Sequence, residues 1–291
     1  MTRRTAALLA GTVVLLSRAP AQISMQDDLG RVVALSSPAQ RVVSLAPSIT
    51  ETLFAISAGD QVCGVTDQCT FPDAARRKPR VGGMANPSIE AIVGLHPDLI
   101  VMSMEGNTRA DFDKLTSLGV TIFVTNPRTF RGIQRSIGQL GALTGHSDAA
   151  ARIDSELQVR EESVERIRTA PPVRALLLVS IDPVIAAGKN TFINDLLERA
   201  GGANIAATVS GNYPALSREA ILASDPAVII ITADLSPDQS TLLARFPEWS
   251  QLAAVRGGRV YRIDPDLISR PGPRAIEGLE HLSQFFHPFH K

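Results

Sequence analysis

Apolar and polar residues follow the same pattern twice along the chain. Residues 88–102 read SIEAIVGLHPDLIVM, and residues 217–231 read SREAILASDPAVIII. The serine, the Glu-Ala-Ile triplet and the proline recur at one constant offset of 129 residues. Because this offset has the length of a domain and not of a solenoid repeat, the chain is predicted to contain two similar halves.

Each copy predicts a short capped helix followed by a buried strand. Ser88 and Ser217 are suitable N-caps, and Glu90 and Glu219 fall in the first turn, where the helix dipole favours negative charge. The helix is expected to end before the proline. The apolar run that follows is typical of a strand in a parallel sheet that helices cover on both faces.

Further apolar runs continue this alternation of strands and helices. Strands are predicted over 41–45, 62–66, 121–124, 175–180 and 259–263, and helices over 110–118, 130–144, 191–200 and 274–286. Residues 147–168 carry apolar positions at helical spacing, and Pro171-Pro172 ends that pattern. We therefore predict an N-terminal α/β lobe (22–144), a connecting helix (145–170) and a C-terminal α/β lobe (171–291), the alternative being that this helix covers the surface of one lobe.

The first predicted core strand leads directly into a candidate binding loop. Ser48 and Glu51, which follow strand 41–45, have the spacing of a capping box and predict the start of a helix. A strand that feeds a helix places the intervening loop at the carboxyl end of the sheet, where open α/β folds bind ligands. The loop around Ser48 is therefore a candidate site.

Composition narrows the functional classes. The chain has 291 residues, of which 44% are hydrophobic, enough for two domains with cores of their own. Its 29 Lys and Arg residues balance 29 Asp and Glu residues, which gives no electrostatic footprint for nucleic acid or an anionic membrane.

The first 21 residues have the pattern of an export signal. Arg3 and Arg4 precede an apolar stretch from Ala6 to Leu16, and Ala19-Pro20-Ala21 resembles a cleavage site. No cysteine follows the apolar stretch, as a bacterial lipoprotein would require. We expect residues 1–21 to be a signal peptide and the mature protein to be soluble in a periplasm-like compartment.

The two cysteines, Cys63 and Cys69, leave two interpretations open. In an oxidising compartment they are candidates for a small-loop disulfide. Cys63 also lies in a strand-like segment, which suits a buried thiol equally well. A metal site built on two isolated cysteines is not expected.

Five blocks of sequence, in their order along the chain, resemble periplasmic binding proteins with a helical backbone. These proteins serve ABC importers of cobalamin, haem and ferric siderophores, and the chain is most similar to the cobalamin-binding type. The blocks are RVVSLAPSITETLFAISAGDQVCGVTDQCTFP (41–72), VGGMANPSIEAIVGLHPDLIVM (81–102), AGKNTFINDLLERAGGANIA (187–206), LSREAILASDPAVIIIT (216–232) and WSQLAAVRGGRVYRID (249–264). Together they cover essentially the whole mature chain.

This resemblance implies a fold, a ligand and a partner. It implies an α/β protein with two Rossmann-like lobes, a long backbone helix and a ligand cleft between the lobes. The ligand would be a corrinoid, held by a monomeric periplasmic protein without a cofactor of its own and delivered to an ABC permease dimer. In the family each lobe presents a surface glutamate to permease arginines, and these positions fall on Glu90 and Glu219. Helix-dipole partners without a docking role are the alternative.

The resemblance also supplies candidate ligand-binding residues. They are Pro47, Ser48, Ile49, Phe71, Gly83, Met84 and Asn86 in the first lobe, and Asp182, Tyr213 and Arg270 in the second. The chain departs from the aromatic-rich cleft of the cobalamin-binding type, since it has one Trp and two Tyr. Trp249 is expected in the core.

Each alternative ligand would require different residues in the cleft. Haem would need an axial Tyr or His, for which Tyr213 is the candidate. An anionic ferric siderophore would need clustered arginines, for which Arg270 and Arg274 are the candidates. A zinc or manganese site would need converging histidines and carboxylates, whereas His281, His287 and His290 crowd the C-terminus away from the predicted cleft, so no metal site is expected.

An enzymatic function rests on analogy of fold alone. Two Rossmann-like lobes also build oxidoreductases. The sequence has no Gly-x-Ser-x-Gly, no His-Glu-x-x-His and no dinucleotide fingerprint, and too few cysteines for a metal cluster. We therefore predict a binding protein and no catalytic residues.

Overall fold

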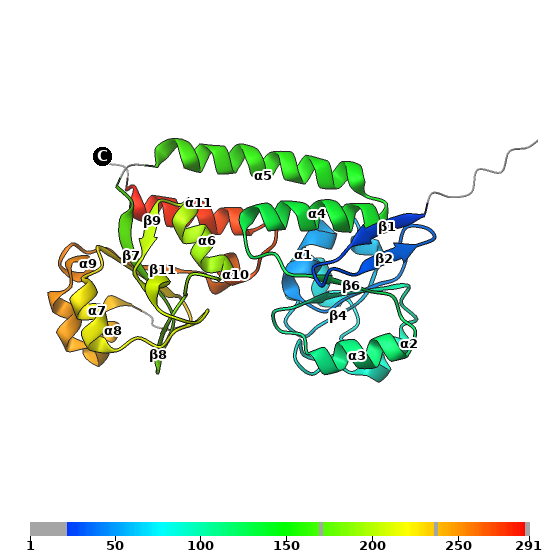
Figure 1. Cartoon of the computed structure of the whole chain (residues 1–291), viewed down its shortest axis with the longest axis horizontal. Coiled ribbons are helices and arrows are strands. Elements are labelled where there is room, and N and C mark those ends of the chain that lie inside the picture. The colour runs from blue at the N-terminus through cyan, green and yellow to red at the C-terminus, as the bar shows by residue number, and fades with distance from the viewer. Residues whose placement is uncertain (1–21, 169–170, 236–237, 289–291) are drawn as a thin grey trace, which may run out of the picture.

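Two α/β lobes lie side by side beneath one long helix, α5 (Figure 1). The structure, a computed structural model, describes residues 22–168, 171–235 and 238–288. The predicted signal peptide, residues 1–21, lies outside the described residues. In the described part, no helix is both long enough and apolar enough to cross a bilayer. The predicted α/β class is confirmed.

The N-terminal lobe is built on four parallel strands in the order β4-β3-β5-β6. The strands are β3 (Val42–Ser44), β4 (Val62–Val65), β5 (Leu99–Ser103) and β6 (Ile122–Thr125), preceded by a separate antiparallel hairpin of β1 (Ile23–Gln26) and β2 (Val32–Leu35). The helices are α1 (Pro47–Ala55), α2 (Ile89–Gly94), α3 (Arg109–Ser117) and α4 (Phe130–Thr144), with 3₁₀ turns at Gly59–Gln61 and Asp73–Arg77.

The C-terminal lobe repeats this arrangement. Its parallel strands follow the order β9-β7-β10-β11, and β8 adds an antiparallel edge to β7. The strands are β7 (Val173–Ile181), β8 (Val184–Ala186), β9 (Gly202–Asn204), β10 (Val228–Thr232) and β11 (Val260–Ile263). The helices are α6 (Phe192–Arg199), α7 (Arg218–Ser224), α8 (Gln239–Arg245), α9 (Ala253–Arg256), α10 (Pro265–Ser269) and α11 (Ala275–Phe286), with 3₁₀ turns at Ile205–Thr208 and Pro247–Gln251.

The repeated sequence segments occupy equivalent places in the two lobes, α2 to β5 and α7 to β10. The hydroxyl of Ser88 accepts a hydrogen bond from the backbone N–H of Ala91 at 3.1 Å, and that of Ser217 accepts one from Ala220 at 3.1 Å. Both predicted N-caps are therefore confirmed.

The long helix between the lobes, α5 (Ser147–Ile167), packs along α4 of the first lobe and α11 of the second. Arg160 on α5 pairs with Glu280 on α11 at 2.6 Å, and Glu161 on α5 pairs with Arg199 on α6. The interpretation as a surface helix of one lobe is wrong, since α5 contacts both.

One hydrophobic core runs through both lobes and α5. It includes Phe123 from the first sheet, Leu157 from α5 and Leu177 from the second sheet. Successive residues of each strand point to opposite faces, so Leu176, next to Leu177, packs into a separate outer cluster around Trp249. This explains why the strands read as uninterrupted apolar runs. Trp249 lies in the core as predicted, fully buried and stacked on Phe246.

Of the two interpretations of the cysteines, the structure shows the free thiols and not the disulfide. Cys63 and Cys69 are free thiols. Cys63 packs against the outer cluster of the first lobe, whereas Cys69 belongs to the shared core on the other face of the sheet. The Cys69 sulfur is fully buried between the hydroxyls of Thr50 and Thr66, each 3.1 Å away.

Candidate functional site

A cavity of about 270 Å³ lies between the two lobes, which both contribute residues to its lining. The first lobe contributes Ala46, Pro47, Ser48, Gln68, Met84, Ser103, Glu105, Asn126 and Pro127, and the second contributes Asp266, Ser269, Arg270 and Pro271. The first-lobe residues come largely from the loops that follow β3, β5 and β6. The cavity is therefore at the carboxyl edge of the first sheet, as predicted for the loop around Ser48.

The order of the strands explains the position of the cavity. β3 lies between β4, the next strand in the chain, and β5, so the connections from β3 and β5 leave on opposite sides of the sheet. Such a switch point opens a crevice outside the carboxyl ends of the two strands, where α/β folds bind ligands. Ala46 to Ser48, Ser103 and Glu105 line the cavity at this switch point.

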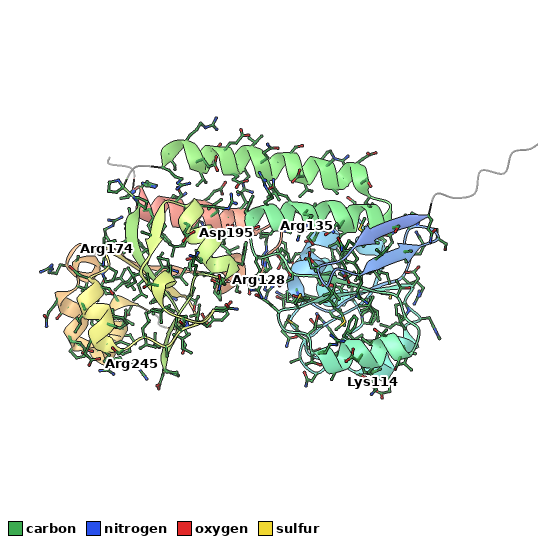
Figure 2. The ribbon with its side chains drawn as sticks, in the orientation of Figure 1. Lys114, Arg128, Arg135, Arg174, Asp195 and Arg245 are labelled. Carbon is green, nitrogen blue, oxygen red and sulfur yellow. The ribbon has the colours of Figure 1, made fainter. Side chains whose placement is uncertain are left out.

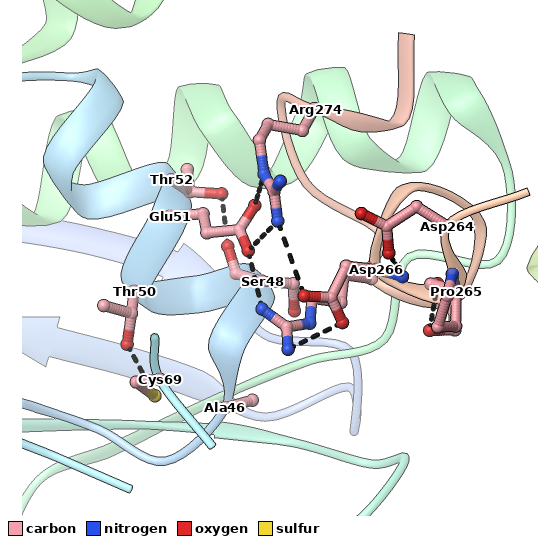
Figure 3. Close-up of polar contacts among 12 residues, drawn as sticks. Ala46, Ser48, Thr50, Glu51, Thr52, Cys69, Asp264, Pro265, Asp266 and Arg274 are labelled. Atoms are coloured by element: carbon pink, nitrogen blue, oxygen red, sulfur yellow. Dashed lines mark hydrogen bonds and ion pairs between the residues drawn. The ribbon is translucent and has the colours of Figure 1, made fainter. Parts of the chain in front are cut away.

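A buried ionic cluster joins the lobes beside the cavity (Figure 3). The Glu51 carboxylate on α1 accepts a hydrogen bond from Arg270 at 3.1 Å and two from Arg274 at 2.9 and 3.0 Å. Asp266 accepts from Arg270 at 2.7 Å, so two carboxylates balance two guanidinium groups. The Glu51 side chain is 2% exposed, which makes it the most buried member of the cluster.

The predicted capping box of Ser48 and Glu51 does not form. Helix α1 begins at Pro47 with Ala46 as its N-cap and no side-chain cap, so Ser48 lies within the first turn. Glu51 is three residues from Ser48 as the pattern requires, but its carboxylate binds arginines of the other lobe.

The two lobes also approach each other closely next to the cluster. A Cβ placed on Gly272 would lie 3.2 Å from the carbonyl oxygen of Ser48. The Arg274 guanidinium lies 4.1 Å from the centre of the Phe71 ring. Farther along the contact, the Asp195 carboxylate on α6 accepts a hydrogen bond from the backbone N–H of Phe130 at 2.7 Å, and Figure 2 shows Asp195 and Arg128 between the lobes.

Of the ten ligand-binding residues predicted from the sequence, the structure brings four together around the cavity: Pro47, Ser48, Met84 and Arg270. Arg270 reaches it from the second lobe, held in place by Glu51 and Asp266.

The other six predicted residues do not line the cavity. Ile49 is buried in the shared core, because it points to the opposite side of α1. Phe71 is covered on one face by Arg274. The Asn86 side chain covers Gly83 within their common turn. Asp182 pairs with Arg245 at 2.5 Å, at the far edge of the second lobe (Figure 2).

Tyr213, the sixth of these residues, is 48% exposed and lies within electrostatic reach of Glu105 and Arg128. Partial burial, together with the negative charge of Glu105, raises the pKa of the Tyr213 phenol above its usual value. The phenol therefore stays protonated at neutral pH.

Sequence reasoning missed most of the polar lining. Gln68, Ser103, Glu105, Asn126, Asp266 and Ser269 all contact the cavity. Ser103 is the last residue of the buried strand β5, Glu105 lies just after it, and Asn126 directly follows β6. The rule that selected the loop after β3 would have selected these residues if applied to every strand.

The lining combines apolar side chains, such as Met84 and Pro127, with uncharged polar side chains and with three charged ones, Glu105, Asp266 and Arg270. It offers amides from Gln68 and Asn126 and hydroxyls from three serines, which both donate and accept hydrogen bonds. The charge of Arg270 is already balanced within the cluster, and Glu105 adds a negative charge. The cavity is therefore suited to a ligand rich in amide or hydroxyl groups and poorly suited to a polyanion.

The two glutamates of the repeated segments are exposed and each is the second residue of its helix. Figure 1 shows α2 and α7 on the side of their lobes that faces away from α5. Hydrogen bonds from its own backbone N–H and from the Ser217 hydroxyl hold the pKa of Glu219 below its usual value. Glu219 is therefore ionised at neutral pH.

Metal ligands do not converge in the described part of the chain, where no three His, Cys, Asp or Glu side chains are grouped to hold an ion. His281 and His287 lie on or just after α11, and His290 lies outside the described residues.

Comparison with known proteins identifies the family. Residues 42–267 match the family described as periplasmic binding protein. The chain is 31% identical over 275 residues to an uncharacterized ABC transporter substrate-binding lipoprotein of Bacillus subtilis, covering 91% of this chain and 86% of the relative. It is also 31% identical over 274 residues to a cobalamin-binding protein of Halobacterium salinarum, covering 91% and 74%.

Solved structures share the fold. The periplasmic vitamin B12 binding protein BtuF of Vibrio cholerae superposes with a TM-score of 0.79 at 26% identity, covering 86% of this chain and 97% of that one. Haem-binding proteins also share the fold, with TM-scores between 0.74 and 0.78. The fold alone therefore does not choose between these ligands.

The family match covers most of the chain and agrees with the two-lobe fold and the interlobe cavity. Members of this group bind a small molecule outside the cytoplasm and work with a membrane transporter. The chain belongs to the periplasmic binding protein family, and it is a substrate-binding protein, not an enzyme.

Proposed function

We propose that this protein binds a corrinoid in the cleft between its lobes and delivers it to an ABC importer. The observation that carries the proposal is the cavity formed by both lobes, whose lining offers amides and hydroxyls. The periphery of a corrin ring carries amide side chains, which pair with amides and hydroxyls. The relative from Halobacterium salinarum and the Vibrio cholerae structure, both named for cobalamin or vitamin B12 binding, support the same ligand.

A corrinoid is larger than the cavity itself. At about 270 Å³ the cavity lies just below the range of about 300–1,000 Å³ that is usual for small-molecule sites. The ligand would therefore rest its amide-bearing edge on Ser48, Gln68 and Asn126 and extend into the space between the lobes. Contacts from both lobes are then needed for full affinity.

Haem is the second candidate, because Tyr213 lies on the second lobe within electrostatic reach of Glu105. Haem iron in proteins is held by His, Cys, Met or Tyr, and a tyrosine binds as the phenolate. The raised pKa of Tyr213 works against the phenolate, and the balanced charge of Arg270 works against haem propionates. A corrinoid fits these electrostatics better.

A titration tests this choice. Mature protein is titrated with cyanocobalamin, cobinamide, haemin and a ferric siderophore by calorimetry and absorbance. We expect one-to-one binding of a corrinoid, a weaker affinity in Gln68→Ala, and an unchanged affinity in Gln158→Ala, whose side chain is exposed on α5. A response to haemin without a response to either corrinoid would refute the corrinoid assignment and leave family membership intact.

We further propose that the protein is an exported monomer and that Glu90 and Glu219 dock it onto a permease dimer. The two acids stand at equivalent places in two similar lobes, an arrangement that suits a partner made of two like subunits. Exposed charges of this kind set register and encounter rate more than ligand affinity. The apolar stretch of residues 6–16 behind Arg3 and Arg4 supports export by a signal peptide.

Transport assays separate docking from ligand binding. The double variant Glu90→Ala with Glu219→Ala is expected to keep its corrinoid affinity and to lose stimulation of the transporter. Glu156→Ala with Glu162→Ala, two exposed acids on α5, serves as the charge-matched control and should transport normally. Equal loss of ligand affinity in the docking variant would mean that these glutamates belong to the ligand site.

A further inference from the structure

Three loops of the first lobe that line the cavity meet at one side chain, Asn107. Its amide nitrogen donates hydrogen bonds to the carbonyl oxygens of Leu45 at 2.9 Å and Met84 at 2.8 Å. Its amide oxygen accepts a hydrogen bond from the backbone N–H of Ser103 at 2.8 Å. Asn107 thus joins the loop after β3, the turn that carries Met84 and the loop after β5.

Only an amide side chain can satisfy all three of these partners. Two of them are carbonyl oxygens, which accept, and one is a backbone N–H, which donates. Only an amide side chain offers two donors and an acceptor on one rigid plane. Aspartate would place a carboxylate oxygen against two carbonyl oxygens, and alanine would leave all three backbone groups without this partner.

The loops held by Asn107 are those that present the lining. Leu45 precedes Ala46, Pro47 and Ser48, while Met84 and Ser103 line the cavity themselves. Asn107 is not among the lining residues, so it acts on a ligand only through the loops. The Ser103 hydroxyl in turn accepts a hydrogen bond from the backbone N–H of Glu105 at 3.2 Å. Through Ser103, Asn107 therefore also positions Glu105, a charged residue of the lining.

We propose that Asn107 is a positioning residue that fixes the three lining loops of the first lobe in the spacing that the ligand requires. The inference deepens the proposed function and rests on it for the identity of the ligand. The loops are then pre-organised before binding, so the ligand does not lose affinity by ordering them. Asn107 thus sets the shape of the site without contacting the ligand.

The second lobe offers a matched control, Asn204. Its amide nitrogen donates to the Ala187 carbonyl at 2.9 Å and to the Asn194 side chain at 2.7 Å, and its oxygen accepts from the N–H of Ala206 at 3.0 Å. Asn204 makes the same number of hydrogen bonds as Asn107 but holds no residue of the cavity lining. Its loss should destabilise the fold without disturbing the cavity.

The test compares Asn107→Ala and Asn107→Asp with Asn204→Ala in two measurements. The first is amide hydrogen exchange of ligand-free protein, in which we expect faster exchange at residues 45–48, 83–84 and 103–105 in both Asn107 variants only. The second is cyanocobalamin affinity, which should fall about tenfold or more in both, because Asn107→Asp loses two hydrogen bonds of ordinary net strength and Asn107→Ala loses three. Asn204→Ala should bind like the wild type.

Each result has a clear meaning. Unchanged exchange at these three loops, or wild-type affinity despite faster exchange, would overturn the positioning role. An equal loss of affinity in Asn204→Ala would show a general effect of destabilisation and overturn it as well. If the wild type binds no corrinoid, the proposed ligand fails, and the exchange measurement still decides whether Asn107 orders the loops. If an Asn107→Ala preparation does not fold, Asn107→Asp, which preserves the shape and the acceptor, carries the test.

Discussion

The buried carboxylate of Glu51 is expected to hold the two lobes together, and Glu51→Gln tests it. The carboxylate makes three contacts of 2.9–3.1 Å with Arg270 and Arg274 and is 2% exposed. Glutamine keeps the shape but places an NH₂ group against a guanidinium donor. Two arginines, each less than one-fifth exposed, are then balanced by Asp266 alone.

The expected cost can be derived from this geometry. Removing one partner of a buried ion pair costs about 3–5 kcal/mol, because a buried charge is left uncompensated. The arginines retain Asp266 and some contact with water, so we expect the lower end, about 3 kcal/mol of unfolding free energy. The cyanocobalamin affinity should fall as well, because Arg270 lines the cavity and loses one of the two carboxylates that hold it.

Equilibrium urea denaturation measures the loss, with Glu162→Gln as control. Glu162 is exposed on α5, and its substitution should change the unfolding free energy by less than about 0.5 kcal/mol. A double-mutant cycle of Glu51→Gln with Arg274→Met isolates the pairwise term. A Glu51→Gln variant as stable as Glu162→Gln would refute the view that this cluster joins the lobes.

Three further predictions follow from individual contacts. Gly272→Ala places a Cβ 3.2 Å from the Ser48 carbonyl oxygen. We therefore expect the unfolding free energy, measured by urea denaturation, to fall by about 1–2 kcal/mol and corrinoid binding to weaken. Wild-type stability and affinity would mean that the lobes can move apart at this contact without cost. Thiol titration of unfolded, unreduced protein should find both cysteines free. A count of zero free thiols would show that Cys63 and Cys69 form a disulfide. Because the pKa of Glu219 is lowered in the folded protein, its contribution to stability is present above the unfolded pKa and lost as pH falls through the folded one. An NMR titration should place the carboxyl midpoint below the usual glutamate value, and Ser217→Ala should raise it; an unshifted midpoint in the wild type would contradict the hydrogen-bonded geometry.

Local features were predictable from the sequence because local physics determines them. Ser88 and Ser217 cap their helices through hydrogen bonds within three residues, and the span of α5 follows from helical periodicity and a terminal proline pair. The sequence pattern predicts no helix between strand 259–263 and helix 274–286, but the structure has the short helix α10 there. Its five residues are too few to show a period.

Contacts between distant residues were not predictable. Glu51 and Arg274 are 223 positions apart, and nothing near Glu51 distinguishes a buried ion pair from a capping box. Asn107 lies 62 positions from Leu45 and meets it only once β3 and β5 are adjacent. The resemblance to a family placed four residues at the cavity, but the contacts that position Arg270 required the structure.

The single core that runs through both lobes has a consequence for how the molecule unfolds. Apolar residues of the first sheet, α5 and the second sheet belong to one continuous cluster, and α11 returns beneath α5 to complete it. Although the repeated segments suggest two equivalent halves, neither half can bury its inner face when expressed alone. We expect the protein to unfold in one cooperative thermal transition, because both lobes belong to the same folding unit.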